Sequence, residues 1–447
     1  MKLKYLFLIQ IFIICFNVFA SERYTLKELL QIANERSDVI NITREEKIIS
    51  TYDKRKAISS LIPDVALYGG HREYTESKKG VHSIELPANL GVFEYETYTQ
   101  PSRASTWGVR LDQNYSLGGR EFIGISIASK NIKRSKYEIE RVAEEYLMAV
   151  VNAYFAVLIS KRNVEIAEEN RIRLESHRKD ALKRYKVGED TKTVLLRAEA
   201  ELSGSESDLE RAQNNLEYAK IYLARLVGIK NGYHIDEVEL KEREKNEIPF
   251  LLKTAYENRP EMKQVKLDEI ISDKQISYAK SAFFPDLGIE GSYSDTDYDP
   301  ETMADELAEE SAYIGVTLTL PIFEGGFRVA DVAQAKARRR EASLSYFDTK
   351  KTVTVEVKEA YLDLKTERRN LEYYKDQLAF ARENYRLMSK QFQVGLASSV
   401  DYIDANTLLL TSERQVNNAY YNYQLSIARL EKAKGKLLEY FDIKNKY

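Results

Sequence analysis

The chain has 447 residues, of which 43% are hydrophobic and 31% are charged, a balance that resembles long surface-charged helices more than one compact core. Its formal net charge of −3 provides no basic field, so no nucleic-acid partner is expected. The single cysteine, Cys15, lies in a segment predicted to be removed. This excludes disulfides, thiolate metal sites and a cysteine nucleophile from the mature protein.

Residues 1–20 are predicted to be a secretory signal peptide. Two lysines precede a mostly apolar run, which ends at the cleavage sequence Val18-Phe19-Ala20. A retained membrane anchor is the weaker interpretation, because spanning a bilayer needs about 20 apolar residues and this run is shorter. The mature chain would begin at Ser21, and no later apolar run approaches spanning length. Any membrane crossing is therefore predicted to use β-strands.

Two copies of one pattern fill the rest of the chain. At an offset of 207 residues, 107–119 aligns with 314–326, and the Val-Gly pairs at 187–188 and 394–395 coincide. Upstream the offset becomes 222, so the first copy carries about fifteen additional residues. Such a repeat indicates a duplicated architecture of helix, two strands, long helix and helix. The predicted boundaries are 21–229 for the first repeat, 230–248 for a linker, and 249–447 for the second repeat with a short C-terminal tail.

Long helices are predicted where proline is absent, because proline in a helix interior lacks an N–H donor and clashes with the preceding turn. The helix at 121–186 would be roughly 100 Å long at about 1.5 Å per residue, and no short helix can cover it alone. We therefore expect two short helices to stack end to end beside each long one. In chain order, the predicted helices are 26–60, 121–186, 192–228, 249–281 with an interruption at Pro260, 328–393 and 399–437.

A heptad pattern marks the packed face of the helices at 192–228 and 399–437. Large residues recur every seven positions and small residues fill the position between them, which favours a coiled coil whose helices approach closely. An ordinary amphipathic helix in a globular bundle is the alternative, but it does not require this regularity in both copies. The residues are Leu195, Leu202, Leu209, Leu216 and Leu223 with Ala198, Ser205, Ala212, Ala219 and Leu226, then Tyr402, Leu409, Val416, Tyr423 and Leu430 with Ala405, Ser412, Ala419, Ser426 and Ala433.

Four strands are predicted between the helices, around 107–115 and 314–320 and after Pro63 and Pro285. Apolar and polar residues alternate in them, as in a transmembrane barrel, although a half-buried strand in a soluble sheet gives the same alternation. Four strands cannot close a barrel, because closed ones need about eight or more, so closure requires several chains. The positions predicted to face lipid are Trp107, Val109, Leu111, Leu287, Ile289, Ile314, Val316 and Leu318.

With these features the chain resembles the TolC family of outer-membrane efflux factors over essentially its whole mature length. The most specific segment is FQVGLASSVDYIDA at 392–405, continued by the heptads to about Ala433. The resemblance implies a mainly α fold with a small β part: long antiparallel coiled-coil hairpins, and four strands per chain contributing to a 12-stranded trimeric β-barrel. It also implies location in the outer membrane of a Gram-negative cell, with a large periplasmic portion.

The function implied by the resemblance is passive conduction through the outer-membrane channel of a tripartite efflux or type I secretion system. The implied partners are two further copies in a homotrimer, a periplasmic adaptor (membrane fusion) protein, an inner-membrane RND or ABC pump, and outer-membrane lipid. A non-channel periplasmic coiled-coil adaptor or stalk protein is the alternative. An adaptor, however, should carry a single hairpin, whereas this chain is predicted to have two.

Asp401 and Asp404 are three residues apart, hence on one helix face, and their counterparts in the first copy are Val194 and Arg197. The resemblance implies that these aspartates form a ring at the periplasmic aperture. Such a ring would attract cations and impede passage. The alternative is that the acids only complement the dipole of a helix N-terminus. The family's gating pattern can include an arginine after the hairpin tip and a tyrosine before it; here these positions are Ala397 and Phe392.

The Val-Gly sequences are predicted at the tips of the two hairpins. A glycine there can end one helix before the next begins, and the resemblance adds contact with the adaptor. The residues are Val187, Gly188, Val394, Gly395 and Leu396.

Two external loops are predicted, around Ser77 to Arg103 and from Asp295 to Glu310. The second contains eight acids and partly matches a calcium loop, but Pro300 occupies the position that requires glycine, so an acidic external loop is favoured. The four histidines are scattered, and no motif of a zinc protease, phosphate loop or nucleophile elbow occurs. No enzymatic activity, metal or cofactor is therefore expected.

Overall fold

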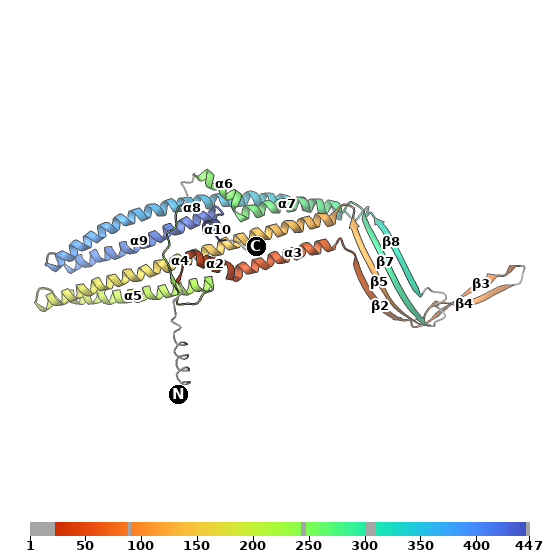
Figure 1. The fold of residues 1–447 in the computed structure, drawn as a ribbon, viewed down its shortest axis with the longest axis horizontal. Coiled ribbons are helices and arrows are strands. Elements are labelled where there is room, and N and C mark those ends of the chain that lie inside the picture. The colour runs from red at the N-terminus through yellow and green to blue at the C-terminus, as the bar shows by residue number, and fades with distance from the viewer. Residues whose placement is uncertain (1–22, 88–90, 243–246, 300–308, 444–447) are drawn as a thin grey trace, which may run out of the picture. The chain divides into compact units, whose positions relative to one another are not determined.

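The computed structural model describes residues 23–87, 91–242, 247–299 and 309–443. The predicted signal peptide lies outside the described residues. Long helices dominate the chain, and in chain order the strands come between them; Figure 1 labels these elements. The helices are α2 (Leu26–Arg36), α3 (Asp38–Ser59), α4 (Arg120–Lys186), α5 (Lys192–Val227), α6 (Ile248–Asn258), α7 (Pro260–Ser281), α8 (Phe327–Gln393), α9 (Ser399–Ala433) and α10 (Leu437–Tyr440).

The predicted helices are confirmed, with two corrections at their ends. The segment predicted as one helix at 26–60 is two, because Ser37 leaves the helical conformation between α2 and α3. The helix predicted at 399–437 ends at Ala433, where Gly435 takes a φ of 69°. A Cβ at Gly435 would lie 2.8 Å from the backbone nitrogen of Arg259, so the turn needs glycine for both conformation and space.

Short helices continue one another end to end, as predicted from their lengths. The end of α5 meets α2, where Arg36 donates a hydrogen bond to the carbonyl of Gly228 at 3.2 Å. The end of α9 meets α6, where Leu430 packs into the same apolar cluster as Leu251. Each pair is therefore joined by contacts at the junction rather than by chain continuity.

The largest apolar core surrounds the middle of α4. Tyr154 and Phe155 are fully buried there, together with residues of α2, α5 and α9. Within the described residues, α4 contains a stretch apolar and long enough by composition to cross a membrane, so the expectation that no such run exists was wrong. The stretch is largely buried against these neighbours, and its hydrophobicity therefore belongs to the core of a helical bundle.

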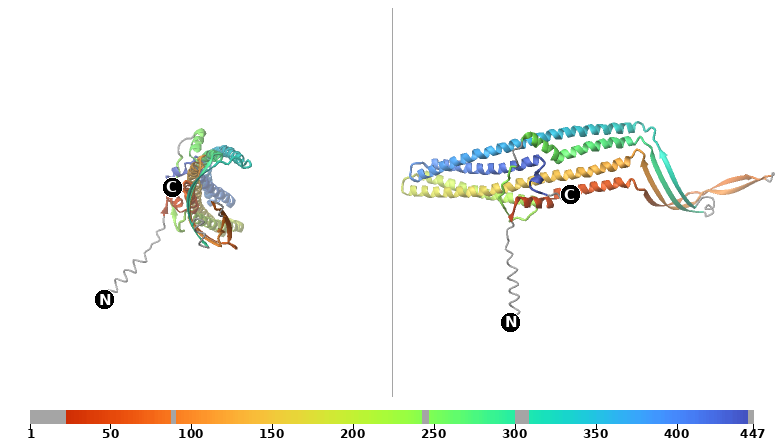
Figure 2. Two further views of the ribbon diagram at one scale, coloured as in Figure 1. Left: turned by 90° about the vertical axis from the view of Figure 1, so that its right-hand side faces the viewer. Right: turned by 45° about the horizontal axis from the view of Figure 1, so that its top comes forward.

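Four antiparallel strands form one sheet in the order β2-β5-β7-β8, and Figure 2 shows them side by side. The register places Leu111 opposite Gly291 and Gly291 opposite Ile314, so residues of this parity share one face. All eight positions predicted to face lipid lie on that face, and the other face carries Arg110, Asp112 and their polar neighbours. The strands are β2 (Asp64–Glu73), β5 (Arg103–Ser116), β7 (Asp286–Asp299) and β8 (Glu310–Thr319).

The segment predicted as an external loop at Ser77 to Arg103 contains a hairpin of two further strands. These are β3 (Lys78–Glu85) and β4 (Val92–Gln100), whose β-branched and aromatic residues favour extended structure. His82 stacks on Tyr95 across the pair, with ring centroids 5.6 Å apart. In the other predicted loop, Asp295 to Asp299 belong to β7, while residues 300–308 lie outside the described part of the chain.

The chain divides into two compact units, and each combines segments from both sequence repeats. One unit contains the described parts of Met1–Glu46, Lys136–Val265 and Tyr346–Tyr447, and the other contains Lys47–Ser135 and Lys266–Ser345. A short parallel pair of β1 (Arg23–Tyr24) and β6 (His234–Ile235) belongs to the first unit. Neither compact unit therefore corresponds to one sequence repeat.

Candidate functional site

The two hairpin tips close by the same backbone geometry. Gly188 and Gly395 have φ values of 80° and 79°, a left-handed conformation that glycine adopts without strain. Glu189 and Leu396 then donate backbone hydrogen bonds to the carbonyls of Arg184 and Gln391. The interpretation of the glycines as helix-ending residues is confirmed.

Three apolar side chains project from these tips. Val187 and Val394 are each 70% exposed, and Leu396 is 81% exposed. Exposed apolar groups cost free energy in water, and several together on one end of a helical hairpin are typical of a contact surface. The tips therefore offer an apolar surface without a partner inside the described part of this chain.

Asp401 caps the N-terminus of α9. Its carboxylate accepts hydrogen bonds from the hydroxyl and the backbone N–H of Ser398, at 2.7 and 2.9 Å, and Ser398 Oγ accepts from the Asp401 N–H in return. These bonds from the side chain and then the backbone of Ser398 hold the pKa of Asp401 below its usual value. Asp404 lies one turn further along the same exposed face. Asp401 thus caps the first turn of α9, and its carboxylate remains exposed.

A row of polar contacts joins α9 to α4. Asn417 donates to Asn163 Oδ1 at 3.0 Å, and Asn406 donates to Asn170 Oδ1 at 2.8 Å. Nearer the tips, the half-buried Arg173 donates to Asn406 and to Glu413. The second hairpin is therefore fastened to the first along much of its length, by bonds that require one register.

An aromatic cluster continues this row toward the tips. The ring of His177 stacks on Tyr402 at 4.2 Å, with an angle of 7° between the planes, and lies 4.7 Å from the ring of Phe392. His177 Nε2 is 3.0 Å from Ser399 Oγ, and the hydroxyls of Tyr385 and Tyr402 are 2.9 Å apart. Burial lowers the pKa of His177 to about 4, although Asp180 and Asp190 oppose the shift. The cluster therefore contains a neutral histidine.

Arg184 completes the junction between the hairpins. Its guanidinium donates to the backbone carbonyl of Phe392 at 2.7 Å and lies over the ring of the same residue. Within its own hairpin it pairs with Asp190 at 3.3 Å and with Glu189 at 3.6 Å. The arginine of this junction thus comes from the first hairpin, and Phe392 contributes a carbonyl rather than a hydroxyl.

Acid is expected to loosen the His177 cluster. In the closed cluster burial keeps His177 neutral, whereas in an opened cluster its imidazole would take up a proton near pH 6.5. The free energy that favours the closed cluster is therefore fully present above pH 6.5 and is lost as pH falls toward 4. The pKa shift corresponds to a loss of about 3 kcal/mol in the free energy of opening, or a roughly hundredfold loss of protection against hydrogen exchange. Hydrogen exchange at residues 392–406, corrected for intrinsic rates at each pH, measures this effect.

The variant His177→Gln separates histidine from the carboxylates that titrate in the same range. It should flatten the change in protection between pH 6.5 and 4, whereas the exposed histidine variant His234→Gln should behave like the wild type. An equal slope in both variants would show that His177 does not control the opening.

The residues of this junction were not identified from the sequence. His177 was one of four scattered histidines, and Arg184 one of many arginines in a charged helix. One signal was available, since the 207-residue offset pairs His177 with Asn384 and Arg184 with Gln391. Both positions depart from the repeat, as Asp401 and Asp404 do.

Comparison with known proteins gives a family match and several relatives. The model of the family described as "Outer membrane efflux protein" matches residues 51–229 and 251–436. The outer membrane protein TolC of Escherichia coli is 24% identical over 421 residues, covering 89% of this chain and 84% of its own length. TolC of Vibrio cholerae is 22% identical over 387 residues, covering 85% and 84%.

Solved structures share the fold. The outer membrane protein VceC of Vibrio cholerae superimposes with a TM-score of 0.75 at 17% identity, covering 92% of this chain and 96% of that one. The CmeC outer membrane channel of Campylobacter jejuni gives a TM-score of 0.75 at 20% identity, covering 92% and 86%. At these identities the likeness concerns the fold alone.

Proposed function

The chain belongs to the outer membrane efflux protein family and is an outer-membrane channel of an efflux or type I secretion system, and we propose that three copies form one tunnel. The family consists of transport channels rather than enzymes, and its members lie in the outer membrane with a large periplasmic portion. Conduction through the tunnel is passive, with energy supplied by a partner pump.

The open sheet supports the homotrimer. Strands β2 and β8 each have one edge without a partner among the described strands, and one face of the sheet is apolar. An exposed edge and an apolar face are both unfavourable until a neighbouring copy pairs with the edge and lipid covers the face. In the trimer, twelve strands would close, and the lipid-facing positions would be Trp107, Val109, Leu111, Leu287, Ile289, Ile314, Val316 and Leu318.

The two aspartates of α9 are proposed to form the narrow aperture. Three copies would bring six carboxylates around one axis, where they attract cations and repel one another. The cap made by Asp401 does not compete with this role, because Ser398 occupies only one oxygen of the carboxylate. The junction at Arg184 and His177 would hold the adjacent hairpin ends together while the aperture is closed.

The hairpin tips are proposed to bind a periplasmic adaptor, which connects the tunnel to an inner-membrane RND or ABC pump. The exposed Val187, Val394 and Leu396 support this role, because an apolar end can be covered by an apolar partner without desolvating a charge. Gly188 and Gly395 supply the tight turns that present these side chains.

Fractionation and conductance test the proposed function. The outer-membrane fraction should contain trimers that detergent dissociates into monomers only after heating. The purified trimer should form single channels in planar bilayers. Recovery as a soluble periplasmic monomer would instead support a coiled-coil adaptor or stalk. That alternative lacks support in the fold, since two hairpins are each joined to a pair of strands.

A further inference from the structure

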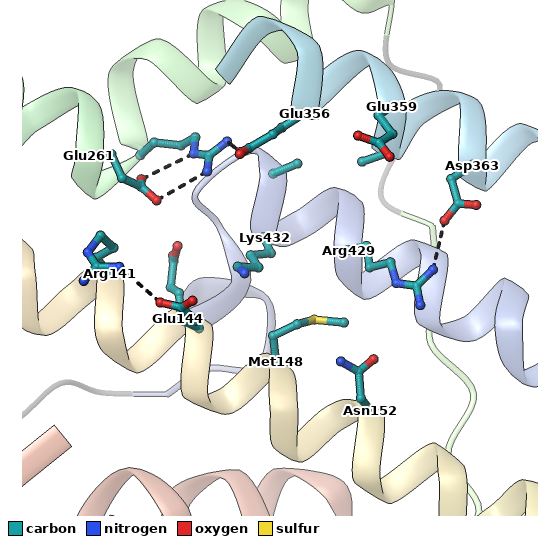
Figure 3. A pocket seen from close by; sticks show the side chains of 14 residues that line it. Arg141, Glu144, Met148, Asn152, Glu261, Glu356, Glu359, Asp363, Arg429 and Lys432 are labelled. Atoms are coloured by element: carbon teal, nitrogen blue, oxygen red, sulfur yellow. Dashed lines mark hydrogen bonds and ion pairs between the residues drawn. The ribbon is translucent and has the colours of Figure 1, made fainter. Parts of the chain in front are cut away.

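A charged pocket lies between α4, α8, α9 and the start of α7, inside the first compact unit (Figure 3). Its volume is about 640 Å³, within the usual range for small-molecule sites. Six carboxylates and four cationic side chains line it, an excess of two acids. None of the roles proposed above uses this pocket.

The three arginines of the pocket are already paired. Arg141 donates to Glu145 at 3.1 Å, and Arg429 donates to Asp363 at 3.1 Å. Arg259 lies between two carboxylates, pairing with both Glu261 and Glu356. These pairs use four of the six acids. Within the described part of the chain, Glu144 and Glu359 remain without an ion pair, and Lys432 is the one pocket cation left to balance them, so these remaining groups keep an excess of one acid.

Glu144 is the informative residue. Only 7% of it is exposed, and it makes no hydrogen bond or ion pair with any residue that the structure describes. Its side chain extends from α4 toward the space shared with Lys432 of α9 (Figure 3). A buried carboxyl group without a partner is unfavourable, and a long charged surface helix offers many positions where it could be solvated instead. The pocket therefore has an unpaired acceptor directed into it.

We propose that this pocket binds a small organic cation, with an ammonium or guanidinium group of the ligand paired to Glu144. Met148 and Ala360 provide apolar wall for an alkyl chain. Glu359 is an exposed residue of the pocket lining and can attract a second positive group of the ligand. A metal ion fits less well, because no group of three His, Cys, Asp or Glu residues in the described ranges is arranged to hold one.

Protonation of Glu144 should compete with the ligand. Desolvation, then repulsion from Glu261, raises the pKa of Glu144 to about 8. A bound cation favours the ionised carboxylate, so affinity should fall as pH is lowered from 8 to 6, by roughly tenfold per unit. The charged groups around Glu144 are Glu140, Arg141 and Glu145 on α4, Arg259 between α6 and α7, Glu261 on α7, Glu356 and Glu359 on α8, and Lys432 on α9.

Calorimetric titration of the purified trimer with putrescine, a diamine that stays doubly charged over this pH range, tests the proposal. Glu144→Gln keeps the size and neutral state of the side chain and should weaken binding at least tenfold. Glu169→Gln is the matched control, since Glu169 is an exposed acid of the same helix, α4, and lies outside the pocket; it should change the affinity less than about threefold.

Three results would overturn the site: no binding up to about 10 mM putrescine, equal affinity of Glu144→Gln and wild type, or wild-type affinity that does not vary between pH 6 and 8. The last measurement needs no variant, so it decides the question even if Glu144→Gln fails to assemble. Loss of binding in both glutamine variants would point to general attraction by the acidic surface of the protein and would also reject Glu144 as the ligand.

Discussion

Replacing Asp401 and Asp404 together by alanine is expected to raise single-channel conductance and to remove block by multivalent cations. The change would eliminate all six carboxylates that the trimer is proposed to place at its aperture, and with them both the mutual repulsion and the cation site. If the ring contributes more than about 1.4 kcal/mol to cation binding, the blocking concentration rises at least tenfold. Planar bilayer recordings measure both quantities.

The alanine pair also removes the cap of α9, a loss of about 1 kcal/mol, so a second variant is needed. Asp401→Asn with Asp404→Asn keeps an acceptor for Ser398 while removing the charge. It should reproduce the loss of cation block. Glu206→Gln with Glu210→Gln, two exposed acids of α5, is the matched control and should leave block unchanged. Unchanged conductance and block in the aspartate variants would reject the ring.

Placing charge on the hairpin tips is expected to abolish adaptor binding without closing the channel. Leu396→Glu with Val394→Glu would require the adaptor interface to desolvate two carboxylates without partners, at a cost of several kcal/mol. Adaptor affinity should fall at least a hundredfold, and efflux in cells should fall with it. Surface plasmon resonance with the purified adaptor measures the affinity.

The same two positions provide the control for that experiment. Leu396→Met with Val394→Ile keeps the tip apolar and should bind the adaptor within about threefold of wild type. Conductance of both double variants in bilayers should match wild type, because the tips lie outside the proposed aperture. If the glutamate variant binds the adaptor normally, the docking site lies elsewhere on the hairpins.

Local sequence patterns predicted most of the secondary structure because each pattern depends only on the residues of one helix or strand. Absence of proline and the heptads gave helix bounds within a few residues, and strand parity placed Leu111 and Ile314 on one face. The patterns failed where tertiary context decided the outcome. Ser37 is compatible with a helix interior by propensity alone, and the apolar run of α4 could be assigned to a core only once its neighbours were known.

The candidate site was predictable only in part, for a related reason. The tip glycines and the aspartates could be found because they repeat or break a repeat over short windows. The junction depends on residues 222 positions apart, His177 and Ser399, and nothing in the sequence near either indicates the other. The role of Glu144 could not be predicted either, because a glutamate in a charged helix is distinguished from its neighbours only when the fold buries it.

The interleaving of the two repeats has a consequence for how the protein is made. Lys27 pairs with Asp442, 415 positions away, and both compact units need segments from the second half of the chain. During export, therefore, the N-terminal half emerges with apolar helix faces and strands that cannot yet be covered. Contacts between residues far apart in the sequence form slowly, and strand edges that stay unpaired until then favour aggregation. The chain is thus expected to depend on periplasmic chaperones until its last helix has crossed the inner membrane.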